Sequence, residues 1–175
     1  AIFDNRLWGL SSAEGIIFHS KEPEQGKKIG WSDAFTIPVL KDAGTPCSLA
    51  GVGQSLLIGC SKGIMRLYGQ GPALDGTGGS YSVPSTVTKS VEVRQDSPAY
   101  SHGDWAIFDT TAGLIKIGAD GRLENIGAAI RNETAGAQLV DIFSEPDRDV
   151  VWCLIGGVFY LYNYFLSISL VLLQL

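Results

Sequence analysis

The chain contains few residues able to act as a nucleophile or a general base. A Ser–His or Cys–His site needs a histidine beside the nucleophile, and the sequence has only His19 and His102. We expect His19 on a strand beside Ser20 and His102 in the turn "YSHGDW", both in ordinary structural roles. The sequence also lacks a GxGxxG or phosphate-loop spacing. It therefore predicts no catalytic residue, no cofactor and no enzyme activity.

Paired carboxylates are the remaining route to catalysis, because glycoside hydrolysis uses two acids that flank one bond. Acids that are distant in sequence can meet at the axis of a repeat fold. The candidates by residue type are Asp33, Asp42, Asp96, Asp104 and Asp141. Aspartate commonly caps turns, and we expect that role for each of them.

The cysteines carry no signature of a disulfide framework or a metal site. Cys47, Cys60 and Cys153 are odd in number and have no C-x-x-C spacing. We expect them to be small buried residues, and we predict no metal site.

Composition favours a globular, β-rich domain. Its 175 residues are 45% hydrophobic but only 18% charged, and 22 of them are glycine, which is typical of short strands and tight turns. Thirteen basic against 18 acidic residues give a net charge of -5, with no basic block. A surface that grips nucleic-acid phosphates is therefore disfavoured.

A repeated unit organises the chain. The segments "SAEGIIFHS", "SKGIMRLYG", "TAGLIKIGA" and "IGGVFYLYN" place a glycine at equivalent points, 48, 50 and 44 residues apart. These glycines are Gly15, Gly63, Gly113 and Gly157. A tight hairpin usually needs a residue with positive φ, which glycine adopts without strain. Three of the apolar segments before them carry a tryptophan, expected to pack within its unit: Trp8, Trp105 and Trp152.

The alternation of residues after the glycine predicts a strand with two distinct faces. In "GIMRLYG", the side chains of Ile64, Arg66 and Tyr68 point to one face and those of Met65 and Leu67 to the other. Lys116 takes the place of Arg66 in the third unit, which indicates a partly solvated face.

The size of the unit predicts the fold class. Three or four strands in about 44 to 50 residues is typical of a propeller blade. We predict an all-β fold, a partial β-propeller of about four blade-like antiparallel units, over residues 1–164. One short amphipathic helix is expected in "GRLENIGAAIRNE", residues 121–133.

The two ends of the chain raise separate expectations. The start "AIFDNRLW" has no signal-peptide pattern, and we expect it to be an internal point of a longer protein. Residues 165–175 are set apart as an apolar tail without an assigned role. Because residues 158–175 carry no charge and are long enough to cross a bilayer, a membrane anchor is an alternative to buried strands.

The order of segments resembles that of a known family. The succession "LAGVGQSLLIGCSKGIMRLYGQG", "VEVRQDSPAYSHGDWAIFDTTAGLIKIGADGRLENIGAAI" and "DIFSEPDRDVVWCLIGGVFYLYNY" is similar to the propeller domains of tailed-bacteriophage tail proteins. These are the tail-hub, nozzle and packaged-DNA-stabilisation proteins of short-tailed phages. Gly121, Leu123 and Ile126 match the family's G-x-[VL]-x-x-[IL] stretch, and Tyr162 its late tyrosine. Residues 31–33, "WSD", match a connection that follows the first hairpin.

The resemblance implies a non-catalytic structural protein of the virion, assembled in the host cytoplasm. Its implied partners are copies of itself in a ring, adaptor or portal-side proteins, and fibre or needle proteins. Double-stranded DNA would pass through the ring without specific binding and be retained by it until ejection, and no small-molecule substrate is implied. Two alternatives stay open: a carbohydrate-binding or glycoside-hydrolysing propeller, and a membrane-anchored propeller.

Overall fold

The computed structural model describes residues 1–31, 35–73, 75, 77–132, 134, 136–166 and 168–174, of which Pro146 and the last range are described as backbone. The described residues form four antiparallel sheets of four strands each, and the strands of each sheet follow one another in chain order. Each sheet is thus a meander, because every strand pairs with its neighbours in the sequence. The all-β prediction is confirmed.

We number the sheets I to IV in chain order. Sheet I contains β1 (Ile2–Phe3), β2 (Arg6–Ser11), β3 (Ile16–His19) and β4 (Thr36–Pro38). Sheet II contains β5 (Pro46–Val52), β6 (Ser55–Cys60), β7 (Gly63–Tyr68) and β8 (Ser85–Thr88). Sheet III contains β9 (Tyr100–His102), β10 (Trp105–Thr110), β11 (Gly113–Gly118) and β12 (Leu123–Asn125). Sheet IV contains β13 (Leu139–Glu145), β14 (Val150–Ile155), β15 (Val158–Asn163) and β16 (Ile168–Gln174).

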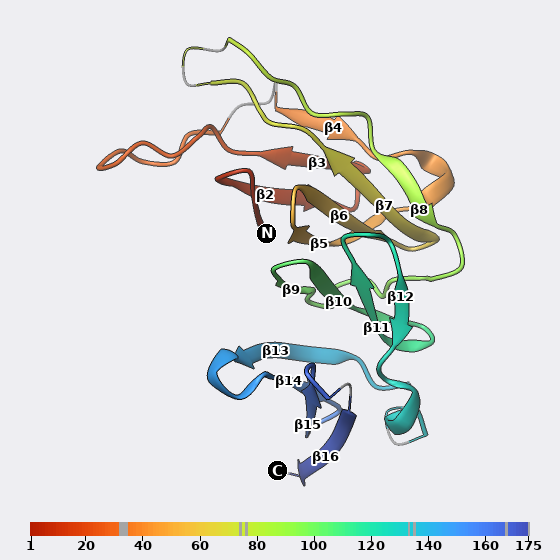
Figure 1. Cartoon of the computed structure of the whole chain (residues 1–175). Coiled ribbons are helices and arrows are strands. Elements are labelled where there is room, and N and C mark those ends of the chain that lie inside the picture. The colour runs from red at the N-terminus through yellow and green to blue at the C-terminus, as the bar shows by residue number, and fades with distance from the viewer. Residues whose placement is uncertain are drawn as a thin grey trace.

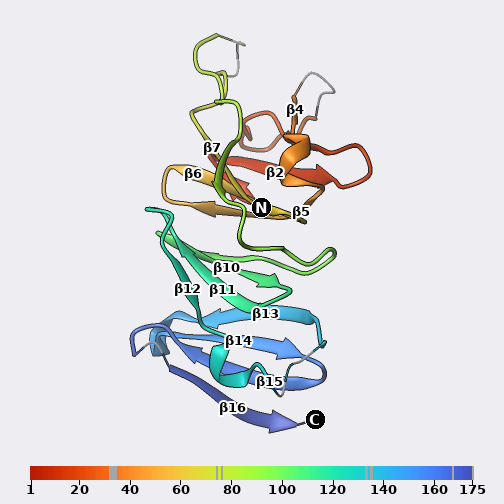
Figure 2. The same ribbon diagram turned by 90° about the vertical axis from the view of Figure 1, so that its right-hand side faces the viewer.

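The sheets follow one another through the molecule in chain order, as Figure 1 and the turned view of Figure 2 show. An apolar cluster lies at each junction. Leu56 and Met65 of sheet II pack with Ile17 of sheet I, whereas Ile64, on the opposite face, packs with Phe108 of sheet III. A third cluster joins sheets III and IV. The alternation of side chains along one strand therefore supplies two different interfaces.

The face of β7 that carries Arg66 is buried at Arg66 and exposed only at its end, where Tyr68 is 47% exposed. Arg66 is only 7% exposed, because sheet III covers this side of β7. The expectation of a partly solvated face is therefore wrong at Arg66 but agrees with the exposure of Tyr68.

The hairpin glycines occupy two different places in their turns. Gly63 and Gly113 are the first residues of β7 and β11, paired with Cys60 and Thr110. Gly15 and Gly157 instead precede the first paired residue of β3 and β15. All four have positive φ, between 68° and 156°. Gly63 is the most constrained, because a Cβ there would meet the carbonyl oxygen of Thr88 on β8.

The helix expected over 121–133 is wrong. Leu123–Asn125 forms β12 and pairs with β11, and only Ala128–Ile130 makes a 3-10 turn. An isolated helix of this length is marginal, and strand pairing with β11 supplies more hydrogen bonds. Gly127 also passes so close to β11 that a Cβ there would lie 2.6 Å from the backbone nitrogen of Leu114.

The end of the chain continues the strand pattern. Residues 168–174 form β16, paired with β15 from Asn163 opposite Ile168 to Val158 opposite Gln174. This strand holds the place that β4, β8 and β12 hold in the other sheets. Across the described part of the chain, no helix is both long and apolar enough to span a bilayer.

Candidate functional site

The two histidines lie in aromatic surroundings. His19 is 5% exposed, and its ring stacks on Phe35 at 4.8 Å. Its Nδ1 lies 2.9 Å from the carbonyl oxygen of Ser20, so Nδ1 carries the proton of the neutral ring. Burial lowers the pKa of His19 more than the hydrogen bond to Ser20 raises it. The Ser20 hydroxyl is itself bonded to backbone, donating to Lys21 and accepting from Leu7.

His102 belongs to a second aromatic group, at the junction of sheets III and IV. Its Nδ1 lies 3.3 Å from the Tyr100 hydroxyl, and its ring lies 5.1 Å from that of Trp105 and 4.9 Å from that of Tyr164. Both histidines are thus part of ring clusters that join strands.

The candidate acids are spread along the chain. Asp33 lies outside the described residues. The other candidates are Asp42 in a 3-10 turn before β5, Asp96 before β9, Asp104 in the β9–β10 turn and Asp141 on β13. Asp42 forms a 4.0 Å ion pair with Lys89, and Asp141 accepts a hydrogen bond from the next backbone nitrogen.

Asp104 has acidic neighbours that the sequence analysis missed. It lines an open cavity of about 710 Å³ together with Asp120, Glu124 and Trp105. The hairpin β11–β12 brings these residues together, and no short-range motif marks them. Asp120 accepts a hydrogen bond from the Arg122 backbone, and Glu124 pairs with Lys116 at 3.2 Å.

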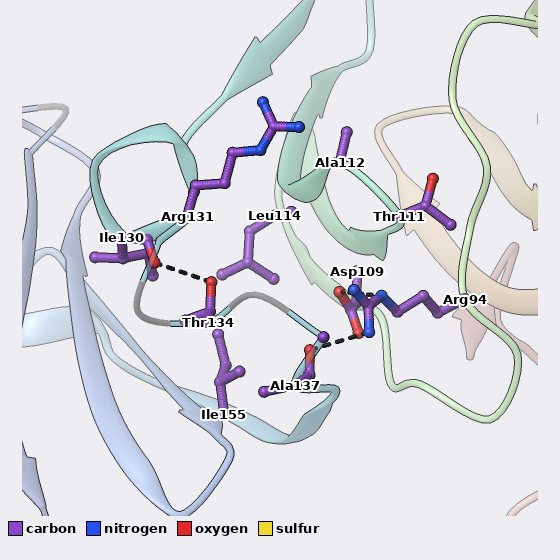
Figure 3. Close-up of a pocket in the computed structure, with 13 residues that line it drawn as sticks. Arg94, Asp109, Thr111, Ala112, Leu114, Ile130, Arg131, Thr134, Ala137 and Ile155 are labelled. Carbon is purple, nitrogen blue, oxygen red and sulfur yellow. Dashed lines mark hydrogen bonds and ion pairs between the residues drawn. The ribbon is translucent and has the colours of Figure 1, made fainter.

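A second cavity, of about 210 Å³, lies between the β10–β11 turn and the chain that enters sheet IV (Figure 3). Arg94 closes one side of it, donating from Nε to the Thr110 carbonyl and from Nη1 to the Ala137 carbonyl. Arg131 and Thr134 lie across the cavity in the same view. The guanidinium of Arg94 thereby ties the loop before sheet III to the start of sheet IV.

Asp109 is the buried acid of this region. It is 4% exposed, and its Oδ2 accepts hydrogen bonds from the Ser97 hydroxyl at 2.8 Å and from the Leu139 backbone nitrogen at 3.0 Å. Arg94 Nε lies 3.7 Å from its other oxygen. A buried carboxylate needs such partners, and here they come from β13 of sheet IV and from the connection between sheets II and III.

A second polar cluster, centred on the carboxylate of Asp4, fixes the loop after β7 to sheet I. Asp4 Oδ2 accepts hydrogen bonds from Arg6, from the Tyr81 hydroxyl and from the Gly71 backbone nitrogen, at 2.7, 2.7 and 2.8 Å. Arg6 also donates to the Pro72 carbonyl. Burial, and then the bond to Asp4, raise the pKa of the Tyr81 phenol. The sequence analysis missed this cluster because its members are up to 77 residues apart.

The cysteines are free and buried. Burial raises the pKa of Cys60 and of Cys153 to about 12, and raises that of Cys47 as well. At neutral pH all three are therefore thiols, which are poor nucleophiles.

The outer face of sheet IV is aromatic. When the sheets are aligned on the last ladder pair before each hairpin turn, Trp152 corresponds to Trp8, Leu57 and Ile107, and Phe159 to Ile17, Ile64 and Leu114. Those six residues are buried under the following sheet, with exposures of 0% to 4%. Trp152 and Phe159 are only half-buried, because sheet IV is the last of the described sheets. The indole Nε1 of Trp152 is nevertheless enclosed and has no hydrogen-bond partner among the described residues. Trp105 lies two positions from this alignment, so the three tryptophans are not all equivalent.

The outer face of sheet I carries the residues that, in the other three sheets, contact the preceding sheet. Leu7 corresponds to Leu56, Ala106 and Val151, and Phe18 to Met65, Ile115 and Tyr160. The six counterparts are 0% to 7% exposed and pack on the preceding sheet. Leu7 and Phe18 are half-buried, and Trp31, 49% exposed, lies 5.5 Å from the Phe18 ring.

Comparison with known proteins bears on the fold only. No family model and no curated protein matches the chain. Among solved structures, the extracellular domain of a putative one-component system of B. thetaiotaomicron matches 98% of this chain, with a TM-score of 0.52 and 13% sequence identity. The chain spans 21% of the length of that protein. The chain is thus similar in fold to a part of a bacterial extracellular domain.

Proposed function

We propose that the four sheets are consecutive blades of a β-propeller and that this propeller is a structural part of a phage tail. The observation that carries the blade assignment is the repetition of one interface. Sheets II and III each offer one face to the sheet before and the other to the sheet after, through apolar clusters at equivalent positions, and sheets I and IV each join this series by one face. Such repetition of four-stranded meanders is typical of propellers.

The tail role rests on the order of segments that resembles tail-hub, nozzle and packaged-DNA-stabilisation proteins of short-tailed phages. In this role the mechanism is steric and interfacial: the chain binds its neighbours in the tail and catalyses no reaction. It would form rings with other copies, join adaptor or portal-side proteins to fibre or needle proteins, and line the path of DNA. A net charge of -5 suits a wall along which DNA slides without specific binding.

A non-catalytic mechanism agrees with the chemistry of the described side chains. His19 has a lowered pKa and bonds to backbone, and the buried cysteines are thiols at neutral pH. The buried carboxylate of Asp109 is engaged by Ser97 and Leu139. The hydrogen bond from Leu139 to Asp109 joins sheets III and IV, so this carboxylate has a structural role.

Immunogold electron microscopy tests the tail role. An antibody against residues 23–29, which are exposed in the β3–β4 connection, is applied to virus particles from a phage that carries the gene. Gold at the tail vertex supports the proposal. Gold on no part of the particle, with the antigen in host membranes or in a secreted fraction, would refute it.

A second candidate function is carbohydrate binding, which the cavity around Asp104, Asp120, Glu124 and Trp105 favours. Carboxylates beside an aromatic ring can hydrogen-bond sugar hydroxyls. A glycan array probed with the wild-type chain and with Asp104→Asn tests this. Binding that is lost in the variant supports the candidate, and a blank array removes it.

A further inference from the structure

We infer that the cavity of about 210 Å³ between sheets III and IV binds a small organic acid, with its carboxylate on two arginines and its apolar part against the cavity wall (Figure 3). The bound acid would hold the junction of the two sheets together and would not react. The inference goes beyond the proposed function and does not depend on it, because residues of this chain alone form the cavity.

Four segments of the chain enclose the cavity. Arg94 lies in the connection between sheets II and III, Ala112 in the β10–β11 turn, Arg131 in the connection between sheets III and IV, and Ile155 at the end of β14. The volume is large enough for several water molecules or for a small organic molecule. A molecule bound here would therefore contact both sheets and both connections.

Two glycines leave part of the wall without side chains. A Cβ at Gly136 would have no described atom within 4 Å, and a Cβ at Gly113 would have only the Cα of Gly127, at 4.0 Å. Both glycines have positive φ, +79° and +105°, so larger residues are disfavoured there. Such positions let a ligand approach the backbone closely.

Arg94 offers the cavity a guanidinium whose orientation is already fixed. Its Nε donates to the Thr110 carbonyl at 3.1 Å and its Nη1 to the Ala137 carbonyl at 3.0 Å, whereas no described residue accepts a hydrogen bond from Nη2. A guanidinium has five N–H donors, so Arg94 keeps donors for a ligand after tying the two segments together. Because the side chain is already held, binding costs little further side-chain entropy.

Arg131 supplies the second guanidinium, from across the cavity (Figure 3). It is exposed, and no described acid forms an ion pair with it. Among the described lining residues the single acid is Asp109. The two arginines and this acid leave one unit of positive charge, which one carboxylate neutralises. The planar fork of arginine matches the two oxygens of a carboxylate.

The rest of the wall favours an acid with a carbon chain. Leu114, Ile130 and Ile155 line the cavity, and each is only 4% exposed. An inorganic anion would leave these side chains against water, whereas a short alkyl chain would cover them. Removing apolar surface from water strengthens binding. The cavity therefore combines one end for a carboxylate with one wall for an aliphatic tail.

The test titrates the whole chain with hexanoate and with three compounds that each lack one of its features. Hexanamide has the tail without the charge, acetate has the charge without the tail, and inorganic phosphate is an anion of another shape. Two-dimensional ¹H–¹⁵N NMR follows the backbone amides of Gly113, Gly127 and Gly136, which line the cavity.

Two variants accompany the titrations. Arg131→Gln removes one guanidinium at an exposed position, and Arg122→Gln, exposed in the β11–β12 turn, is the matched control for a lost positive charge. Circular dichroism checks that both variants are folded.

We expect hexanoate to shift the three glycine amides saturably, with a Kd of about 1 mM. Hexanamide, acetate and phosphate should each bind at least about tenfold more weakly. Arg131→Gln should weaken the binding of hexanoate about three- to tenfold, and Arg122→Gln should leave it unchanged. Hexanoate should also raise the melting temperature of the wild type, because it binds the folded chain.

Four outcomes would overturn the inference. Hexanamide that binds as well as hexanoate would show that the carboxylate is not recognised, and phosphate that does so would show that the apolar wall contributes nothing. The other two are a wild type whose three glycine amides do not shift, and an Arg131→Gln variant that binds like the wild type. None of these outcomes bears on the immunogold experiment, and unlabelled virions would leave the binding of the acid intact.

Discussion

Arg66 on β7 and Lys116 on β11 hold the same position in successive sheets, and each donates a hydrogen bond to the sheet that follows. Arg66 Nη2 bonds to the carbonyl of Gly118 on β11, and Lys116 Nζ to the hydroxyl of Tyr162 on β15, both at 3.2 Å. The two side chains thus repeat one polar contact across two junctions that are otherwise apolar.

Replacing Arg66 by methionine should destabilise the chain by about 1–3 kcal/mol, because a charged donor in a buried site is lost and its acceptors stay behind. Arg66 also donates to the Tyr68 hydroxyl at 2.9 Å. Lys116→Met is the matched comparison. We expect a smaller loss there, up to about 1 kcal/mol, because the Lys116 side chain is 18% exposed and solvent weakens its contacts. Urea unfolding of both variants measures the difference, and a raised midpoint for Arg66→Met would contradict the argument.

Removing the Asp109 carboxylate should loosen the junction of sheets III and IV. Asp109→Ala leaves the Ser97 hydroxyl and the Leu139 backbone nitrogen without their acceptor, at a cost of about 1–3 kcal/mol. Asp109→Asn keeps an acceptor oxygen at that point and should cost markedly less. Thermal unfolding of the two variants compares them, and equal losses would mean that the ion pair with Arg94, not the hydrogen bonds, supplies the stability.

Two glycine substitutions separate backbone strain from steric clash. Gly157 has φ +82° with no described atom within 4 Å of a Cβ, so Gly157→Ala should cost about 1–2 kcal/mol from conformation alone. At Gly63, with φ +156°, the Cβ would also meet Thr88 on the neighbouring strand. Gly63→Ala should therefore cost at least about 1 kcal/mol more. Chemical denaturation of the pair is the measurement, and equal midpoints would refute the clash.

Acid should weaken the fold through His19. Its pKa in the folded chain is lowered from 6.5, mainly by burial, although the Ser20 carbonyl and Asp4 raise it in part and Arg6 lowers it further. The unfolded chain therefore binds a proton first as pH falls below about 6.5, and stability is lost until the lowered pKa is passed. His19→Phe keeps a ring against Phe35 and removes the titration. Unfolding curves between about pH 7.5 and pH 5.5 should show a steeper loss for the wild type than for the variant, and parallel losses would exclude His19 as the cause.

The repeat made the strands predictable, because a hairpin signal is local. Gly63 and Gly113, with alternating residues after them, placed β7 and β11 correctly. The same reasoning failed at Leu123–Asn125, where a short amphipathic pattern favoured a helix, but an open edge of β11 offered a strand more hydrogen bonds. Local pattern does not report which edges are free.

The polar clusters around Asp4 and Asp109 could not be predicted from the sequence, for a different reason. Asp4 and Asn5 both have φ near +50°, as in a type I′ hairpin turn, and that turn was a signal open to prediction. The bonds from Asp4 to Gly71 and Tyr81 were not, because they join segments 67 and 77 residues away. Asp109 resembles any acid at the end of a strand until sheet IV supplies the Leu139 backbone nitrogen.

The meander order of every sheet has a consequence for the growing polypeptide. Because each strand pairs with its neighbours in the sequence, a sheet can close as soon as its fourth strand has left the ribosome, and loops of short span form quickly. The next sheet can then pack on a sheet that is already folded. During synthesis the nascent chain exposes, on its newest sheet, the apolar face that will contact the following sheet. Chaperones would therefore meet these faces one after another, first that of Leu57 and Ile64 and later that of Trp152 and Phe159.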